Sequence, residues 1–305
     1  MELRNLATKI GYLLKETFRG FREADGLKLS AALSYYTIFS LPALLIIIIF
    51  LSGVFFAADA VRGEIFEQLN RLVGKDATLQ VQEAIRNVTL SDSSVLTTIL
   101  GGVILAIGAS GVFSEIQGSI NRIWGIKGKP KRGMTKFMYN RLMSFSMIGS
   151  VGFLLLLGLI ISSLAKILNE HLVILFPQDA ITLFSIVNTL VVFLIVTLLF
   201  SIIFRILPDG KVALSDCLVG ASFTGFLFMI GKFAIGIYLG KFSIASIYGA
   251  AGSIILILVW VYYSAAILYF GAEFTRVFAQ THGHKIVPYE YSVQIKKHNN
   301  RELGG

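Results

Sequence analysis

The feature that most constrains this chain is a series of long stretches without any charged residue. These stretches are residues 29–58, 95–113, 142–165, 180–204, 217–231 and 242–272. A helix needs about 20 apolar residues to cross a hydrocarbon core of about 30 Å. The stretch at 217–231 reaches that length if the helix continues past Lys232, whose side chain can extend to the headgroups. The chain is therefore predicted to be an all-α, polytopic membrane bundle of about six transmembrane helices.

Composition agrees with a membrane protein and argues against a soluble enzyme. Charged residues make up 15% of the 305 residues and hydrophobic residues 55%, whereas about a quarter of a soluble domain is charged. The single cysteine, Cys217, excludes an intrachain disulfide and is expected to be a small apolar filler within a span. No cleavable signal peptide is expected, because the first apolar stretch is too long for a signal core.

Lysine and arginine are unevenly distributed among the segments that connect the predicted spans. The N-terminal segment has six, the segment after the second span seven, the segment after the fourth two and the C-terminal segment five. The remaining seven of the 27 lie in segments on the opposite side. Because cytoplasmic segments carry the excess of positive charge, both termini are predicted to be cytoplasmic. The net charge of +9 is expected to meet anionic lipid at the span ends rather than nucleic acid.

The segments outside the predicted spans complete the expected organisation. Residues 1–28 form a basic amphipathic helix that either lies at the cytoplasmic interface or docks on the bundle. The six-span membrane domain covers 29–279. Within it, 59–94 form an outer helical loop and 125–141 a basic cytoplasmic loop, and 280–305 are a cytoplasmic tail.

The first predicted span contains a proline near its middle. Pro42 removes a backbone donor and clashes with the preceding turn, so a kink or a break is expected there. Tyr35, Tyr36 and Ser40 lie on the N-terminal side of that point. These hydroxyls either line a substrate path beside a broken helix or belong to a kink that ordinary packing absorbs.

A polar stripe and several glycines mark other spans. Ser110, Ser114, Gln117 and Asn121 share one face of the helix that continues the second span. That stripe either faces a water-filled vestibule or makes hydrogen bonds between helices. Tyr248 opens a glycine-rich stretch at the start of the sixth span and is a further candidate for a substrate path. Glycines in the fifth and sixth spans favour either tight helix packing or a sliding gate.

Charged residues near the predicted cytoplasmic span ends are candidates for a gate. The acids are Glu115, Asp216 and Glu273, and the arginines at similar depth are Arg122, Arg205 and Arg276. Charges near the hydrocarbon are costly and are usually paired, so some pairing within this set is expected. The set acts either as an ion-pair lock or as ordinary interfacial charge.

No residue pattern predicts a catalytic group, a metal ion or a cofactor. Metal-dependent RNA hydrolysis requires clustered histidine and carboxylate ligands in water. The four histidines are His171, His282, His284 and His298, and only His282 and His284 are close together. Ribonuclease activity is therefore not expected.

Three passages resemble the YihY/BrkB family of bacterial inner-membrane proteins. They are residues 31–42 (AALSYYTIFSLP), residues 119–125 (SINRIWG), and short matches at 207–208, 220–221, 248–252, 260–262 and 271–273. The passages occur in the family's order over nearly the whole chain. The resemblance implies a six-helix protein of the bacterial cytoplasmic membrane. Family members carry labels derived from ribonuclease BN and from serum resistance, and one branch is linked to export of lipopolysaccharide precursors.

Two functions of different classes follow from these features. The first is a transporter or flippase of a lipid-like, amphiphilic envelope substrate, for which Glu115 or Glu273 would carry a coupling proton. No nucleotide-binding loop is present in the sequence, so the energy would come from an ion gradient or from another protein. The second is a non-transporting scaffold that organises envelope machinery.

Overall fold

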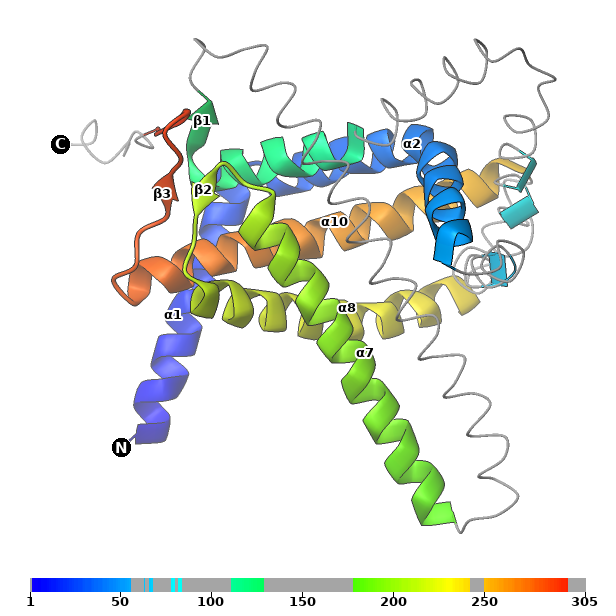
Figure 1. The fold of residues 1–305 in the computed structure, drawn as a ribbon. Coiled ribbons are helices and arrows are strands. Elements are labelled where there is room, and N and C mark those ends of the chain that lie inside the picture. The colour runs from blue at the N-terminus through cyan, green and yellow to red at the C-terminus, as the bar shows by residue number, and fades with distance from the viewer. Residues whose placement is uncertain are drawn as a thin grey trace.

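The computed structural model describes residues 2–55, 63, 66–67, 78–79, 82–83, 111–128, 178–241 and 250–295. The long helices are α1 (Glu2–Glu23), α2 (Gly26–Phe55), α7 (Gln178–Ile206), α8 (Leu214–Lys241) and α10 (Ala250–Thr281), and residues 111–124 are also helical. α10 lies at the centre, because it packs against α1, α2 and α8, and α7 packs against α8 (Figure 1). The predicted all-α membrane bundle is confirmed.

Three of the described helices are long and apolar enough to cross a membrane. The qualifying segments are Thr189–Ile206, Leu214–Phe233 and Ile257–Thr281. They correspond to the last three predicted spans, and α2 covers most of the first. The predicted span at 142–165 lies outside the described residues, as do most of the span at 95–113 and most of the loops at 59–94 and 125–141.

The outward faces of α7 and α8 are apolar. Their exposed large side chains include Ile186, Leu190, Leu194 and Leu198 on α7, and Phe226, Ile230 and Phe233 on α8. The four residues of α7 are spaced one helical turn apart, so they form a continuous stripe. An apolar surface of this extent is unfavourable in water but is the surface that hydrocarbon requires.

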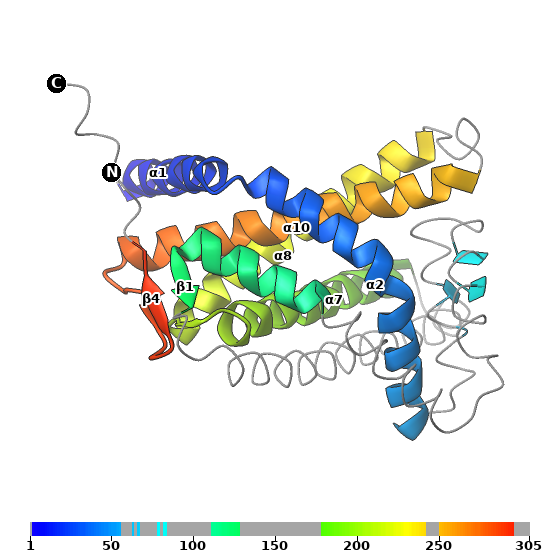
Figure 2. The same ribbon diagram turned by 90° about the horizontal axis from the view of Figure 1, so that it is seen from above.

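α2 is one continuous helix that passes through Pro42. Figure 2 shows that this helix changes direction along its length. The expectation of a kink or a break is therefore met by a bent helix and not by two separate half-helices. Asp25, with a φ of 59°, makes the turn between α1 and α2, and a left-handed residue commonly ends a helix in this way.

α1 crosses the end of α10 at a steep angle (Figures 1 and 2). Its inner face is docked, because Leu13 packs with Phe274 and Val277 of α10. On its outer face a second apolar stripe, Ile10, Leu14 and Phe18, is exposed. The two expectations for this helix are therefore compatible, since one face packs on the bundle and the other is available to lipid.

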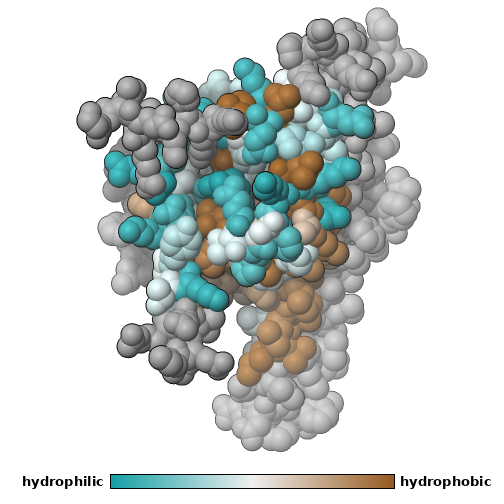
Figure 3. Space-filling view, turned by 90° about the vertical axis from the view of Figure 1, so that its left-hand side faces the viewer, coloured by the Kyte–Doolittle hydropathy of each residue, from teal (hydrophilic) through white to brown (hydrophobic). Residues whose placement is uncertain are grey.

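Two short antiparallel strand pairs join the connections at one end of the bundle. β1 (Ile126–Gly128) pairs with β4 (Ser292–Gln294), and β2 (Gly210–Lys211) pairs with β3 (Val287–Pro288). We call this region, residues 124–128, 207–212 and 282–295, the strand end. Side chains on the face of the molecule at this end are largely hydrophilic (Figure 3). The predicted tail, residues 280–305, therefore contributes β3 and β4 to the fold.

The best-packed part of the core lies next to the strand end. Its most deeply buried side chains come from four helices and are Ile120, Ile123, Trp124, Phe204, Cys217, Ala221, Tyr269 and Ala272. Because these apolar residues surround the ends of the helices, any polar group among them needs a specific partner. The candidate site consists of polar groups in this setting.

Candidate functional site

Asp209, in the turn between α7 and β2, is the buried acceptor of a network that joins two distant parts of the chain. Its carboxylate accepts hydrogen bonds from Gln117 Nε2 at 3.1 Å and from Asn121 Nδ2 at 3.0 Å. Its backbone N–H donates to Asn121 Oδ1 at 2.8 Å. Only 3% of Asp209 is exposed. Since a buried carboxylate is costly unless its oxygens are satisfied, these contacts hold the turn against helix 111–124.

Helical spacing explains which members of the predicted polar stripe reach Asp209. Gln117 and Asn121 are one turn apart and therefore point to the same side. Ser114 is exposed, and Ser110 lies outside the described residues. At two of its positions the stripe makes hydrogen bonds between segments, which was one of the two interpretations left open by the sequence.

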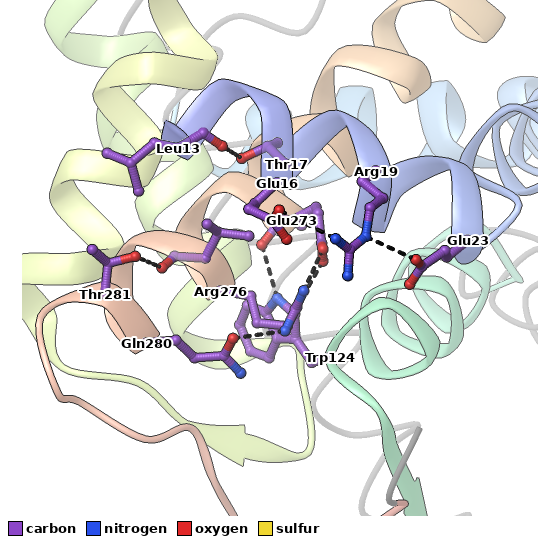
Figure 4. Close-up of polar contacts among 12 residues, drawn as sticks. Leu13, Glu16, Thr17, Arg19, Glu23, Trp124, Glu273, Arg276, Gln280 and Thr281 are labelled. Atoms are coloured by element: carbon purple, nitrogen blue, oxygen red, sulfur yellow. Dashed lines mark hydrogen bonds and ion pairs between the residues drawn. The ribbon is translucent and has the colours of Figure 1, made fainter. Parts of the chain in front are cut away.

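Glu273 and Arg276 of α10 form a buried ion pair (Figure 4). Arg276 Nε donates to Glu273 Oε2 at 2.8 Å, and Nη2 donates to Oε1 at 2.5 Å. The Glu273 side chain is 0% exposed and that of Arg276 is 18% exposed. A two-point pairing of this kind is the arrangement in which arginine compensates a buried carboxylate best. The pairing expected among the charged candidates is found here.

α1 covers the Glu273 carboxylate. A Cβ atom placed on Gly20 would lie 1.6 Å from Glu273 Oε1, so any side chain at this position would have to displace the paired carboxylate. On the same helix Arg19 bridges Glu16 and Glu23, at 3.3 Å and 3.1 Å. The buried pair thus lies beneath a crossing helix on which Glu16, Arg19 and Glu23 are paired with one another (Figure 4).

Asp216, in the first turn of α8, is paired with a residue that the sequence did not suggest. His284 Nδ1 lies 2.9 Å from Asp216 Oδ2. The Asp216 side chain is 2% exposed and the His284 side chain is 53% exposed. This contact links the start of α8 to the segment that follows α10. The interaction is an ion pair only when His284 is protonated.

The other charged candidates do not pair with one another. Arg122 contacts Asp25 at 2.6 Å, in the turn that follows α1. Arg205 donates a short hydrogen bond to the carbonyl of Val212. Glu115 accepts a hydrogen bond from Ser119 within its own helix, at 3.2 Å. Of the six candidates, therefore, only Glu273 and Arg276 are partners of each other in these contacts.

The candidates on α2 are in two different environments. Tyr35 and Tyr36 are 61% and 45% exposed, and their rings contact each other edge to face at 5.9 Å. Ser40 is buried, and a Cβ on Gly111 would lie 3.6 Å from its Oγ. The Pro42 side chain and Tyr248 lie outside the described side chains. The tyrosines are accessible from the side of the bundle, whereas Ser40 belongs to the contact with helix 111–124.

α8 and α10 interlock through two reciprocal glycine–threonine contacts. A Cβ on Gly220 would lie 1.9 Å from Thr275 Oγ1, and a Cβ on Gly271 would lie 1.9 Å from Thr224 Oγ1. Each threonine hydroxyl also donates to a carbonyl in its own helix, Thr224 to Gly220 and Thr275 to Gly271. This geometry favours tight packing over the sliding gate that was the other interpretation of these glycines.

The sequence did not single out Asp209, His284 or Asp25 as site residues. Asp209 and His284 contact residues 88 and 68 positions away in the chain, and helical periodicity carries no information at that separation. The sequence contains one signal for Asp209, because this acid lies in a Pro-Asp-Gly turn between two apolar stretches. The polar stripe of helix 111–124 requires a hydrogen-bonding partner, and this turn could supply one.

Within the described part of the chain, no three histidine, cysteine or acidic side chains are grouped so that they could hold a metal ion. The polar groups are arranged instead as contacts between segments. Asp209 joins helix 111–124 to the turn after α7, and Asp216 joins α8 to the segment after α10.

Comparison with known proteins gives a consistent result. A family model described as virulence factor BrkB matches residues 17–292. A UPF0761 membrane protein of Saccharophagus degradans is 26% identical over 276 residues, which are 89% of this chain and 60% of that protein. Another, of Psychromonas ingrahamii, is 27% identical over 255 residues, 83% of each chain. A third, of Pseudoalteromonas atlantica, is 27% identical over 264 residues. No solved structure matches.

Proposed function

We propose that this chain, which belongs to the virulence factor BrkB family of integral membrane proteins, transports an amphiphilic envelope substrate across the bacterial cytoplasmic membrane. The resemblance of the sequence to the YihY/BrkB family is confirmed by the family match. The proposed orientation places the strand end and both termini in the cytoplasm, in accord with the distribution of lysine and arginine.

The observation that carries this proposal is the presence of three buried carboxylates at one end of a membrane bundle. Asp209, Asp216 and Glu273 are 3%, 2% and 0% exposed. Buried ionic groups contribute little net stability compared with well-packed apolar residues. Ionisable groups retained close to hydrocarbon are usually functional. We infer that these carboxylates take part in transport. Their protonation would open the contacts between segments at the cytoplasmic end.

The chemistry of the surroundings supports an amphiphilic substrate. The α1 helix presents an exposed apolar stripe at Ile10, Leu14 and Phe18, with basic residues on the same helix. Such a helix associates with anionic lipid. Tyr35 and Tyr36 are exposed beside the bundle, where an amphiphile could reach them from the bilayer.

A scaffold is the second candidate, and the α8–α10 interlock favours it. At the glycine–threonine contacts each threonine side chain fits against a glycine of the facing helix, and close packing of this kind disfavours sliding of the two helices. A transporter must therefore move other elements against a rigid α8–α10 pair, as in rocking mechanisms. A scaffold needs no such movement.

The two candidates differ in their response to neutralisation of the buried carboxylates. The test compares Glu273→Gln and Asp216→Asn with the matched change Glu23→Gln, at an exposed acid of α1. The readout is growth of a host that lacks its own copy, under an envelope stress that the wild-type chain is first shown to relieve. Transport predicts that both buried variants fail at wild-type protein level while Glu23→Gln succeeds. Recovery by all three variants would sink the transport proposal and favour the scaffold.

A further inference from the structure

A cavity of about 460 Å³ lies at the strand end, beside the last turns of α10. Its polar lining comes from Arg276 and Gln280 of α10, from His284 and Lys285 in the segment after it, and from Gln294 of β4. Among the described residues that line it, none is acidic. The polar part of the cavity wall therefore consists of groups that carry positive charge or can donate hydrogen bonds.

The acids that partner Arg276 and His284 lie behind these side chains and not in the cavity wall. Glu273 is fully buried against Arg276, and Asp216 is 2% exposed beneath His284. Arg276 donates from Nε and Nη2 to Glu273 and from Nη1 to Gln280. A guanidinium has five N–H donors, so its outer edge retains donors for a ligand. Each acid thus fixes the direction in which its partner side chain faces the cavity.

Lys285 adds an exposed cation that lies next to His284 in the chain. An ammonium group has three donors and adapts to an anion as a point charge. Gln280 and Gln294 are anchored by contacts to Arg276 and to the Trp124 carbonyl, at 2.9 Å and 3.2 Å. The wall is thus held in place before any ligand arrives, which lowers the cost of binding.

We propose that this cavity binds a phosphate-bearing anion. Phosphate is the anion whose charge and several acceptor oxygens best match a planar arginine edge together with a lysine. The cavity volume suits a phosphate ester or the headgroup of an anionic lipid rather than a whole lipid. The hydrophilic face at the strand end gives access from water (Figure 3). This site does not depend on the transport proposal.

The chain provides its own reporter for this site. It contains two tryptophans, and one of them, Trp124, lines the cavity. In a Trp260→Phe background the fluorescence of Trp124 can be followed alone. The protein is placed in phosphatidylcholine nanodiscs and titrated with inorganic phosphate, with sodium chloride at equal ionic strength as the reference. A second preparation uses nanodiscs that contain phosphatidic acid.

We expect a saturable fluorescence change with phosphate that chloride does not reproduce. Lys285→Gln should weaken phosphate binding about tenfold, because a charged hydrogen bond is lost, whereas Lys285→Arg should restore most of it. Lys127→Gln, on the exposed side of β1 and outside the cavity, is the matched control and should bind like the parent.

The lipid preparation identifies the source of the phosphate group. If a headgroup occupies the cavity, phosphatidic acid shifts the Trp124 spectrum and abolishes the response to free phosphate. If the ligand is water-soluble, the titration is the same in both nanodiscs. No saturable response to either probe would overturn the proposal. So would equal weakening by Lys285→Gln and Lys127→Gln, because that would show general surface charge instead of a site.

Discussion

Asn121 uses both ends of its side-chain amide to hold one turn. It donates to the Asp209 carboxylate and accepts from the Asp209 backbone N–H, at 3.0 Å and 2.8 Å. Ser114 occupies the same predicted stripe but is exposed. The contribution of a polar residue to the stability of this protein therefore depends on the partner with which it forms hydrogen bonds, and not on its membership of a polar stripe.

Replacement of Asn121 by alanine should destabilise the protein, because it leaves a buried carboxylate and a buried N–H without these partners. We expect a loss of about 2 kcal/mol in the free energy of unfolding, since an unsatisfied buried group costs about 1–3 kcal/mol. Ser114→Ala should change it by less than about 0.5 kcal/mol. Denaturant unfolding in detergent micelles measures both. Equal effects of the two changes would contradict the network.

Gly20 is the point at which α1 can approach the Glu273 carboxylate. Gly20→Ala should weaken the docking of α1 and lower the melting temperature, because the added Cβ would lie 1.6 Å from Glu273 Oε1. Gly11 lies in the same helix with no atom within 4 Å of its would-be Cβ. Gly11→Ala should instead stabilise by about 0.5–1 kcal/mol through helix propensity. Stabilisation by both substitutions would show that α1 is not docked at Gly20.

At the scale of the elements, the α8–α10 interlock is the contact most sensitive to small changes in volume. Gly220→Ala should destabilise strongly, because the new Cβ would collide with the Thr275 side chain. The double variant Gly220→Ala/Thr275→Ala removes the colliding hydroxyl and should recover part of that loss. A double-mutant cycle of melting curves measures the coupling between the two positions. Additive effects would mean that the two helices do not interlock there.

The elements differ in how far the sequence could predict them. The apolar stretches predicted α7, α8 and α10, because about 20 uncharged residues have few alternatives to a membrane helix. The Glu273–Arg276 pair could be predicted from the sequence, because residues three apart in a helix are neighbours. The strand pairs were not, because segments of two or three residues such as Gly210–Lys211 show no alternation. Their pairing depends on which helix ends meet.

At the scale of the whole molecule, the strand end is proposed to face the cytoplasm. Single cysteines at Lys211 (strand end, exposed) and Gly63 (outer loop, exposed) can test this in a Cys217→Ala background. A membrane-impermeant maleimide should label position 63 in intact cells and position 211 only after permeabilisation. The reverse pattern would place the positive segments outside and contradict the orientation.

The central claim, that the protein carries an amphiphilic substrate, is tested most directly by native mass spectrometry of gently purified protein. We expect one saturable, chemically distinct amphiphile that is lost in folded Tyr35→Ala and Tyr36→Ala variants, whose side chains are exposed beside the bundle, and retained in Lys127→Gln. Only bulk phospholipid in membrane proportions, unchanged in all these variants, would contradict transport and leave the scaffold as the better account.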